Sequence, residues 1–269
     1  FTLSSGIIRN NKSYDGGAVR IRNNSRFVMN GGSISSNYAV SQSIINCFRG
    51  GSFIMNGGAI SSNTCYSDCG SAIYTAQSGE ANTVQLLGGQ ITGNISDTSR
   101  THCAVKFNNS IGDTVVLENV VIANNTAKGG EQPSYGLTFS AAIKVTVKAG
   151  VQIYGHSNGD MFLPDGITFT ISGALNAGGK TTHIGINMAK PGAFSTGYGT
   201  ANSSVNPSNY FFSNDTNYYV TNSGTGSSMR PALVAQPSTP VKQTTLTWQY
   251  STNNSTWTSV ANGGTSHTV

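Results

Sequence analysis

A repeating pattern of apolar and polar positions organises the first half of the chain. Residues 27–37 (FVMNGGSISSN) return almost unchanged as residues 53–63 (FIMNGGAISSN). Related stretches begin at Phe1, Val84 and Val115, so successive copies are 26, 26, 31 and 31 residues apart. Self-similarity at this period is typical of a solenoid, in which each repeat forms one turn of a coil.

Three positions of the repeat are apolar in every copy. The first and third positions are two residues apart, which is the periodicity of a strand, and no segment has the 3.6-residue periodicity of a helix. The first and eighth positions are predicted to stack inside the molecule. They are Phe1, Phe27, Phe53, Val84 and Val115 in one column, and Ile8, Ile34, Ile60, Ile91 and Ile122 in the other.

A further short strand is predicted before each copy, as in residues 18–21 (AVRI), 104–107 (AVKF) and 142–145 (AIKV). Its outward positions include Arg20, Lys106 and Lys144. Three short strands per repeat describe one coil of a right-handed parallel β-helix, with equivalent residues roughly 4.8 Å apart. We therefore predict an all-β fold: a β-solenoid with a C-terminal cap and a short terminal β-hairpin.

The eleventh position of the repeat is always asparagine. An amide at a bend can donate to one neighbouring coil while it accepts from the other, which satisfies turn backbone that would otherwise be buried without a partner. We predict an asparagine ladder formed by Asn11, Asn37, Asn63, Asn94 and Asn125.

Beyond Asn125 the pattern weakens and the composition changes. We predict a parallel β-helix over residues 1–188, a capping region over residues 189–234, and a linker followed by β-strands of a second, truncated Ig-like module over residues 235–269. In this last stretch, residues 245–251 and 253–260 are read as a hairpin. The capping region holds an aromatic cluster that either covers the end of the rod or stacks on sugar rings. Its members are Tyr210, Phe211, Phe212, Tyr218 and Tyr219.

Only 9% of the 269 residues are charged, against about 25% in ordinary globular domains. The surface is instead rich in Asn, Ser, Thr and Gly, which favours an extracellular location. The net charge is +5 and its surplus lies in the first fifty residues. No groove of interleaved basic and aromatic residues indicates nucleic-acid binding, and no apolar run approaches the ~20 residues of a membrane span. Candidate ligand contacts are Arg20, Lys106, Lys144, Tyr210, Tyr218 and Tyr219.

Four cysteines are present, at Cys47, Cys65, Cys69 and Cys103. An even number in a secreted chain permits up to two disulfides, and buried thiols are the alternative. A zinc site needs four convergent ligands at short paired spacings, which these positions do not provide. We therefore predict no metal and no cofactor.

The enzymatic alternative is a polysaccharide lyase or glycoside hydrolase, because parallel β-helices also carry these activities. Such chemistry needs clustered carboxylates, or a calcium site with a nearby base. The ten acidic residues are scattered, and the best available set is Asp160 and Asp165 near His156, with Lys144 and Lys148. The sequence therefore favours a non-catalytic role.

The repeat F-x-M-x-G-G-x-I-x-x-N, preceded by Gly16-Gly17-Ala18-Val19, resembles the β-helix repeats of bacterial cell-surface proteins. The tetrapeptides Gly57-Gly58-Ala59-Ile60 and Phe53-Ile54-Met55-Asn56 are similar to those of the polymorphic membrane protein adhesins. The resemblance covers roughly residues 1–188, and the stretch 248–257 (WQYSTNNSTW) resembles strand pairs of Ig-like modules. It implies a cell-surface location and an adhesive or scaffolding role. The expected partner is a host glycan or matrix surface, or another copy of the chain joined end to end by strand addition into a filament.

Overall fold

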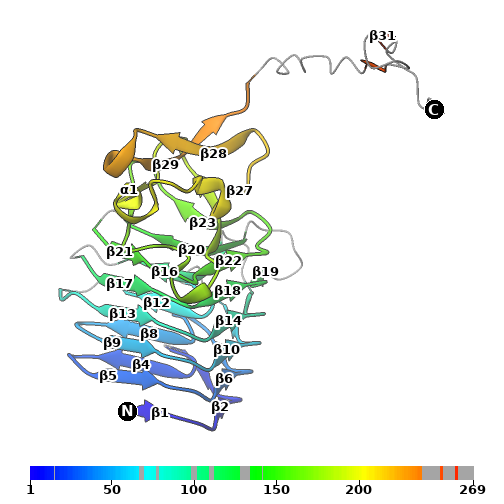
Figure 1. Ribbon diagram of the computed structural model, residues 1–269. Coiled ribbons are helices and arrows are strands. Elements are labelled where there is room, and N and C mark those ends of the chain that lie inside the picture. The colour runs from blue at the N-terminus through cyan, green and yellow to red at the C-terminus, as the bar shows by residue number, and fades with distance from the viewer. Residues whose placement is uncertain are drawn as a thin grey trace. The chain divides into compact units, whose positions relative to one another are not determined.

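The computed structural model describes residues 1–14, 16–66, 70–76, 79–97, 102–108, 112–127, 134–140, 142–237, 249–250 and 258–259. The chain divides into two compact units, Phe1–Ala235 and Gln236–Val269. In the first unit the chain winds through successive coils whose strands stack in parallel (Figure 1). The predicted all-β, parallel β-helix fold is confirmed.

Each coil contributes a strand to each of several faces. The first face is an eight-stranded sheet of β1 (Thr2–Leu3), β5 (Arg26–Met29), β9 (Ser52–Met55), β13 (Thr83–Leu86), β17 (Thr114–Leu117), β21 (Lys144–Val147), β24 (Phe169–Ile171) and β26 (Ser195–Thr196). The second face contains β2 (Ile7–Arg9), β6 (Ser33–Ser35), β10 (Ala59–Ser61), β14 (Gln90–Thr92), β18 (Val121–Ala123) and β22 (Gln152–Tyr154). The third contains β4 (Val19–Arg22), β8 (Ile45–Phe48), β12 (Ile73–Thr75), β16 (His102–Phe107), β20 (Ser134–Phe139) and β23 (Gly159–Leu163).

A fourth face, which the sequence pattern did not predict, lies between the second and third. It is a five-stranded sheet of two-residue strands: β3 (Lys12–Ser13), β7 (Tyr38–Ala39), β11 (Thr64–Cys65), β15 (Ile95–Ser96) and β19 (Thr126–Ala127). Their second residues are in register and are all small: Ser13, Ala39, Cys65, Ser96 and Ala127. Each of these coils therefore has four strands rather than three.

The predicted apolar columns lie in register inside the rod. Ile34 pairs with Ile60 across neighbouring strands, and Phe27 pairs with Phe53. The rings of Phe27 and Phe53 stack with centroids 5.6 Å apart and planes 14° apart. Phe1 continues this stack onto Phe27 at 5.6 Å but stays 79% exposed, because no described coil covers its other side.

One strand was predicted on the wrong face. The sequence AIKV at residues 142–145 looked like a third-face strand, but β20 occupies that place and Leu137 pairs with Val105 there. Lys144 instead begins β21 on the first face, where it pairs with Thr114. The prediction was wrong because residues 142–145 resemble the third-face sequence AVKF at 104–107. The connection before β21 differs in length from the equivalent connections of earlier coils, so sequence similarity did not identify the face.

The five predicted ladder asparagines lie one above the other at the bend after the second face. Each amide nitrogen donates to the side-chain oxygen of the next asparagine, at 2.9, 3.0, 2.8 and 2.9 Å from Asn11 up to Asn125. The backbone N–H of each donates to the same oxygen. The residue before each asparagine has a positive φ, as in Ser36 at 54° and Ser62 at 55°, so the chain turns there.

Two faces of the rod merge near its C-terminal end. Strand β25 (His183–Met188) pairs with β22 through its first residues and with β23 through its last, so one straight strand joins the second and third faces. The connection from β24 to β25 contains η2 (Ala177–Gly179). After β25 the chain forms α1 (Tyr198–Asn202), η3 (Pro207–Asn209), β27 (Phe211–Ser213), β28 (Tyr218–Ser223), η4 (Gly226–Ser228) and β29 (Arg230–Ala235). Parallel stacking extends past Met188, since β26 pairs with β24 and β27 with β25.

Aromatic side chains close the core at this end. Phe194, Tyr198 and Phe211 are fully buried, and the Phe194 and Phe211 rings meet edge to face at 5.3 Å. Phe211 also lies 6.1 Å from Phe169, the last aromatic residue of the first-face column. This cluster covers the end of the core, as aromatic rings with large apolar surfaces do.

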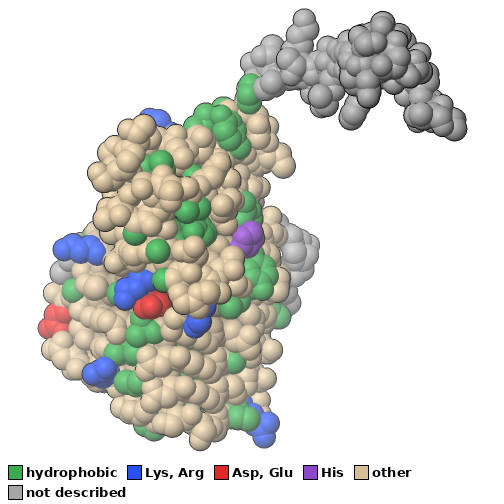
Figure 2. Space-filling view, in the orientation of Figure 1, with side chains coloured by type: hydrophobic (Ala, Val, Ile, Leu, Met, Phe, Trp, Pro, Cys, Tyr) green, Lys and Arg blue, Asp and Glu red, His purple; other side chains and the backbone are tan. Residues whose placement is uncertain are grey.

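Charged side chains are sparse on the face that Figure 2 shows, and most of that surface is backbone or uncharged polar groups. Among the described residues, no helix has the length and apolarity needed to cross a membrane. In the second unit, β30 (Gln249–Tyr250) pairs antiparallel with β31 (Thr258–Ser259), within the stretch predicted as a hairpin.

Replacing Asn63 by alanine is expected to destabilise the rod strongly. The Asn37 backbone N–H and side-chain amide would both lose their acceptor, and the Ile34 carbonyl would lose a donor. We expect Asn63→Ala to lower the free energy of unfolding by about 3 kcal/mol, and Asn11→Ala, in the same column but exposed, by under about 1 kcal/mol. Urea unfolding followed by circular dichroism measures both, and equal losses would contradict the ladder as a source of stability.

Candidate functional site

The asparagine ladder ends in a cluster of polar residues at the top of the third face. The ladder asparagine follows the second-face core residue by three positions in every coil, as in Ile122 and Asn125. The next core residues in that column are Ile153, Ile184 and Phe211. Three positions beyond them are His156, Asn187 and Asn214, so the cluster consists of the ladder positions of the last three coils.

His156 is the last rung of the ladder. The Asn125 amide nitrogen lies 3.2 Å from His156 Nε2 and also donates to the carbonyls of Ile91 and Ala123. Those two acceptors identify the Asn125 atom as the amide nitrogen, so His156 Nε2 must accept. Nδ1 then carries the proton and donates to Asp160 Oδ1 at 2.9 Å. The geometry therefore requires a neutral His156.

Asp160 connects His156 to the cap. Its Oδ1 also accepts from the His156 backbone N–H at 3.1 Å, and its Oδ2 accepts from the Asn214 amide at 2.8 Å. The Asn214 side-chain oxygen accepts in turn from the Asp160 backbone N–H at 2.9 Å. Gly185 lies against this network, and a Cβ there would collide with Asp160 Oδ2. Only glycine allows β25 this close.

The straight course of β25 explains why Asn187 leaves the ladder. Gly155, before His156, still has a positive φ of 78°, whereas Ile186 and Ser213, before Asn187 and Asn214, lie within strands. Without the bend, the side chain at the ladder position no longer lies parallel to the rod axis, where it could reach the equivalent residue of the next coil. The Asn187 amide instead donates to the Asn158 carbonyl at 2.9 Å.

These residues surround a polar pocket of about 330 Å³. Its lining comes from the loop after β22, from β25 and from the turn after β27. The lining residues with polar side chains are Ser157, Asn158, Asn187, Asn214, Asp215 and Thr216, and the fully buried side chain of His156 lies behind them. None of the described lining residues is Lys or Arg, and Asp215, which is half-buried, supplies a carboxylate.

An aromatic pair flanks the pocket. Tyr135 and Phe162 lie with ring centroids 4.7 Å apart, and both side chains are half-buried. The Asn158 amide donates to the Tyr135 hydroxyl at 2.7 Å, and Asn187 pairs in register with Phe162. Burial raises the pKa of Tyr135, and the hydrogen bond from Asn158 opposes that shift in part. The phenol therefore stays protonated at neutral pH.

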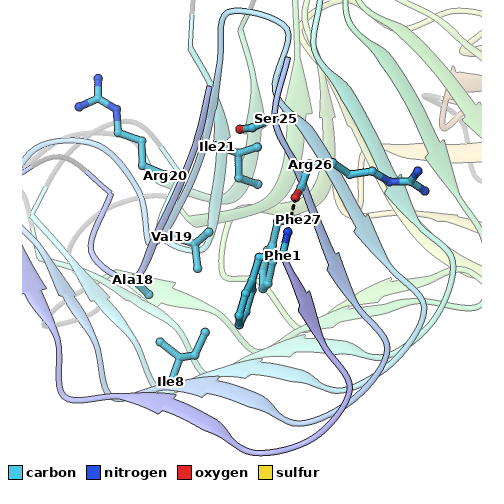
Figure 3. Close-up of a pocket in the computed structure, with 9 residues that line it drawn as sticks. All are labelled: Phe1, Ile8, Ala18, Val19, Arg20, Ile21, Ser25, Arg26 and Phe27. Carbon is cyan, nitrogen blue, oxygen red and sulfur yellow. Dashed lines mark hydrogen bonds between the residues drawn. The ribbon is translucent and has the colours of Figure 1, made fainter. Parts of the chain in front are cut away.

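A second cavity, of about 390 Å³, lies at the first coil. Figure 3 shows Phe1, Ile8, Val19 and Ile21 around it, while the charged ends of Arg20 and Arg26 point away. The Phe1 amino group donates to the Arg26 carbonyl at 2.9 Å. The apolar part of the lining is Phe1 with the inward residues of β2, β4 and β5, so this surface is suited to another β-coil rather than to a polar small molecule.

The structure separates most of the predicted ligand contacts. Arg20 and Lys106 share one outward column of the third face, with Asn46 and Tyr74 between them. Lys144 lies on the first face. Tyr218 is half-buried and Tyr219 is 39% exposed, both on β28.

Tyr210 was predicted as a possible ligand contact, and the structure contradicts this. Its side chain is only 6% exposed, and its ring packs against that of Tyr198 with centroids 6.5 Å apart. Tyr210 is therefore part of the aromatic core of the cap.

The predicted lyase constellation is not assembled. Asp160 is buried and both of its oxygens are bound by His156 and Asn214. Asp165 is exposed on the turn after β23, and Lys144 lies on a different sheet. Lys148 pairs with Glu118 at 3.2 Å on the first-face side. The side chains of His156 and Asp160 hydrogen-bond to the ladder residue Asn125, to each other and to Asn214.

Cys47 is a buried thiol and not half of a disulfide. It lies on the inner side of β8, where its register partners are Ile21 and Thr75. Burial and then Asp113 raise the pKa of this thiol well above its usual range. Cys65 occupies a small-residue position of the fourth face, and its Sγ donates to the Gln42 carbonyl at 2.7 Å. Cys103 is buried on β16, and Cys69 lies outside the described residues.

Sequence reasoning missed Asn158, Asn187, Asn214 and Asp215 as site residues. The signal for two of them was present, because Asn187 and Asn214 follow their core residues by the same three positions as the ladder asparagines. Comparisons with family models, curated proteins and solved structures found no match for this chain.

The hydrogen bonds of His156 predict its tautomer. A two-bond proton–nitrogen correlation spectrum at neutral pH is expected to show protonated Nδ1 and unprotonated Nε2, since Nε2 accepts from Asn125. The exposed His183 serves as the internal control, because no asparagine rung fixes its ring. An Nε2-protonated ring or an imidazolium at position 156 would contradict the ladder end described here.

Proposed function

We propose that the chain belongs to a non-catalytic extracellular protein of a bacterial cell surface, with an adhesive role. The observation that carries this proposal is a charge-poor rod, stabilised by stacking along its length, that presents a polar pocket with an aromatic pair beside it near one end. The resemblance of its repeats to those of surface adhesins supports the same role. A rigid rod holds a binding site at a fixed distance from its other end, which suits attachment.

Beads coated with the chain test this proposal. They are expected to be retained on mucin, on extracellular matrix or on epithelial cell layers well above beads coated with albumin, because a surface adhesin binds such layers multivalently. Soluble chain in excess should displace the beads. Retention at the albumin level on all three surfaces would contradict an adhesive role.

A second candidate function is association between copies of the chain through the first coil. The apolar cavity in Figure 3 favours it, since its inward side chains match the surface of another coil. At the other end, Phe194, Tyr198 and Phe211 are buried beneath the cap. Pairing of two first coils would give a closed dimer, one of the two end-to-end assemblies, dimer or filament, that the sequence analysis considered.

Ile8→Asp is expected to abolish this association, because it places a charge in the apolar cavity. Arg9→Asp is the matched control, as Arg9 is the exposed neighbour on the same strand. Light scattering after size exclusion should give a mass that rises with concentration for the parent chain and for Arg9→Asp, and a monomer for Ile8→Asp. A monomeric parent at all concentrations would exclude the dimer.

A further inference from the structure

We propose that the pocket at the ladder end binds a neutral, hydroxyl-rich carbohydrate. This inference rests on the adhesive function proposed above and names the ligand class of its site. Three properties of the described residues support it: an excess of hydrogen-bond acceptors, an adjacent aromatic pair and the absence of a cation.

The free polar atoms of the pocket offer more acceptors than donors, since the Ser157 and Thr216 hydroxyls can do both and the other polar side chains have only acceptors left. The amide nitrogens of Asn158, Asn187 and Asn214 each donate within the protein, to Tyr135, Asn158 and Asp160 respectively. Among the described contacts, the side-chain oxygens of Asn158 and Asn187 make no hydrogen bond. Asp215 Oδ1 accepts from the backbone N–H and the side-chain amide of Asn217, which leaves Oδ2 available as an acceptor. A ligand rich in donors, such as sugar hydroxyls, complements this set.

The apolar half of the proposed site is the aromatic pair beside the pocket, which adjoins the polar lining without being part of it. A pyranose ring carries C–H groups on its faces and hydroxyls around its edge, so it can lie on an aromatic surface while its edge reaches polar atoms. Tyr135 and Phe162 form such a surface, and each is tied to a pocket asparagine by a hydrogen bond or by strand register. Rigid aromatic side chains give contact area at a low entropy cost.

The charge of the pocket lining favours neutral sugars over acidic ones. Asp215 is the carboxylate that faces the pocket, and the described lining has no Lys or Arg. The cation of the same outward column, Lys106, is separated from Phe162 by Thr138. A sulphated or sialylated glycan would therefore meet like charge without a compensating ion pair, which disfavours it.

The site is also formed in advance of binding. Hydrogen bonds from Asn187 to the Asn158 carbonyl and from Asn158 to the Ser134 carbonyl hold the loop, and Asp160 holds Asn214. A volume of about 330 Å³ is at the small end of the ~300–1,000 Å³ typical of ligand pockets. It fits a short stretch of a glycan rather than a long chain.

Titration of the full chain with cellotriose, lactose and chitotriose, followed by calorimetry and saturation-transfer NMR, tests the proposal. A heparin tetrasaccharide is the acidic comparison, and each titration is repeated with EDTA. At least one neutral probe is expected to bind without a metal, and heparin is expected not to bind at this pocket. Phe162→Leu and Asp215→Ala should each weaken that binding roughly tenfold, by loss of ring contact and of a hydroxyl acceptor.

Thr138→Ala is the matched control, because Thr138 pairs with Phe162 one strand further down the same column. It should leave binding unchanged, and thermal unfolding should show that all three variants fold. The proposal is overturned if no neutral probe binds, if heparin competes at the pocket, if EDTA abolishes binding, or if both pocket variants bind like the parent. Retention of coated beads without sugar binding would leave the adhesive function standing and remove only its ligand class.

Discussion

The structure depends on hydrogen bonds between equivalent residues of successive coils. Strand pairing fixes one coil on the next, and the asparagine ladder repeats the same contact at the bend, where the backbone would otherwise lack partners. The apolar columns require the same alignment, since a shift by one residue would turn Ile34 and Ile60 away from the core. Polar and apolar positions therefore enforce one register, and the rod needs few charges to hold it.

A ladder of this kind has a direction, and its end needs a different residue. Each amide donates toward the C-terminal end, so the last rung must accept without donating onward along the ladder. Histidine does this when Nδ1 holds the proton and a carboxylate orients the ring. Asp160 provides that carboxylate, and Asn214 from the cap satisfies its other oxygen. The buried His156 and Asp160 pair is thus explained by the ladder itself.

The sequence was sufficient for the fold wherever the repeat is regular. Apolar columns and ladder asparagines were identified because each occupies a fixed position in copies of nearly constant length. The fourth face was missed because two-residue strands carry no periodicity, although the small residue two places after each ladder asparagine marked it. Lys144 was misplaced because short apolar motifs are alike on different faces once coil length varies. Tyr210 looked like a surface residue because composition alone does not distinguish an aromatic cap from an aromatic binding surface.

The candidate site could not be read from residue types, since Asn187 and Asn37 are the same amide at the same repeat position. What separates them is the preceding residue, left-handed at Ser36 and extended in strand β25 at Ile186. The bend directs Asn37 along the rod into the ladder, whereas the straight strand leaves Asn187 beside the third face, next to Phe162. That strand runs on without the bend because it joins the second and third faces into one sheet. A pocket of amide acceptors therefore arises where the coil geometry ends but the repeat's asparagines continue.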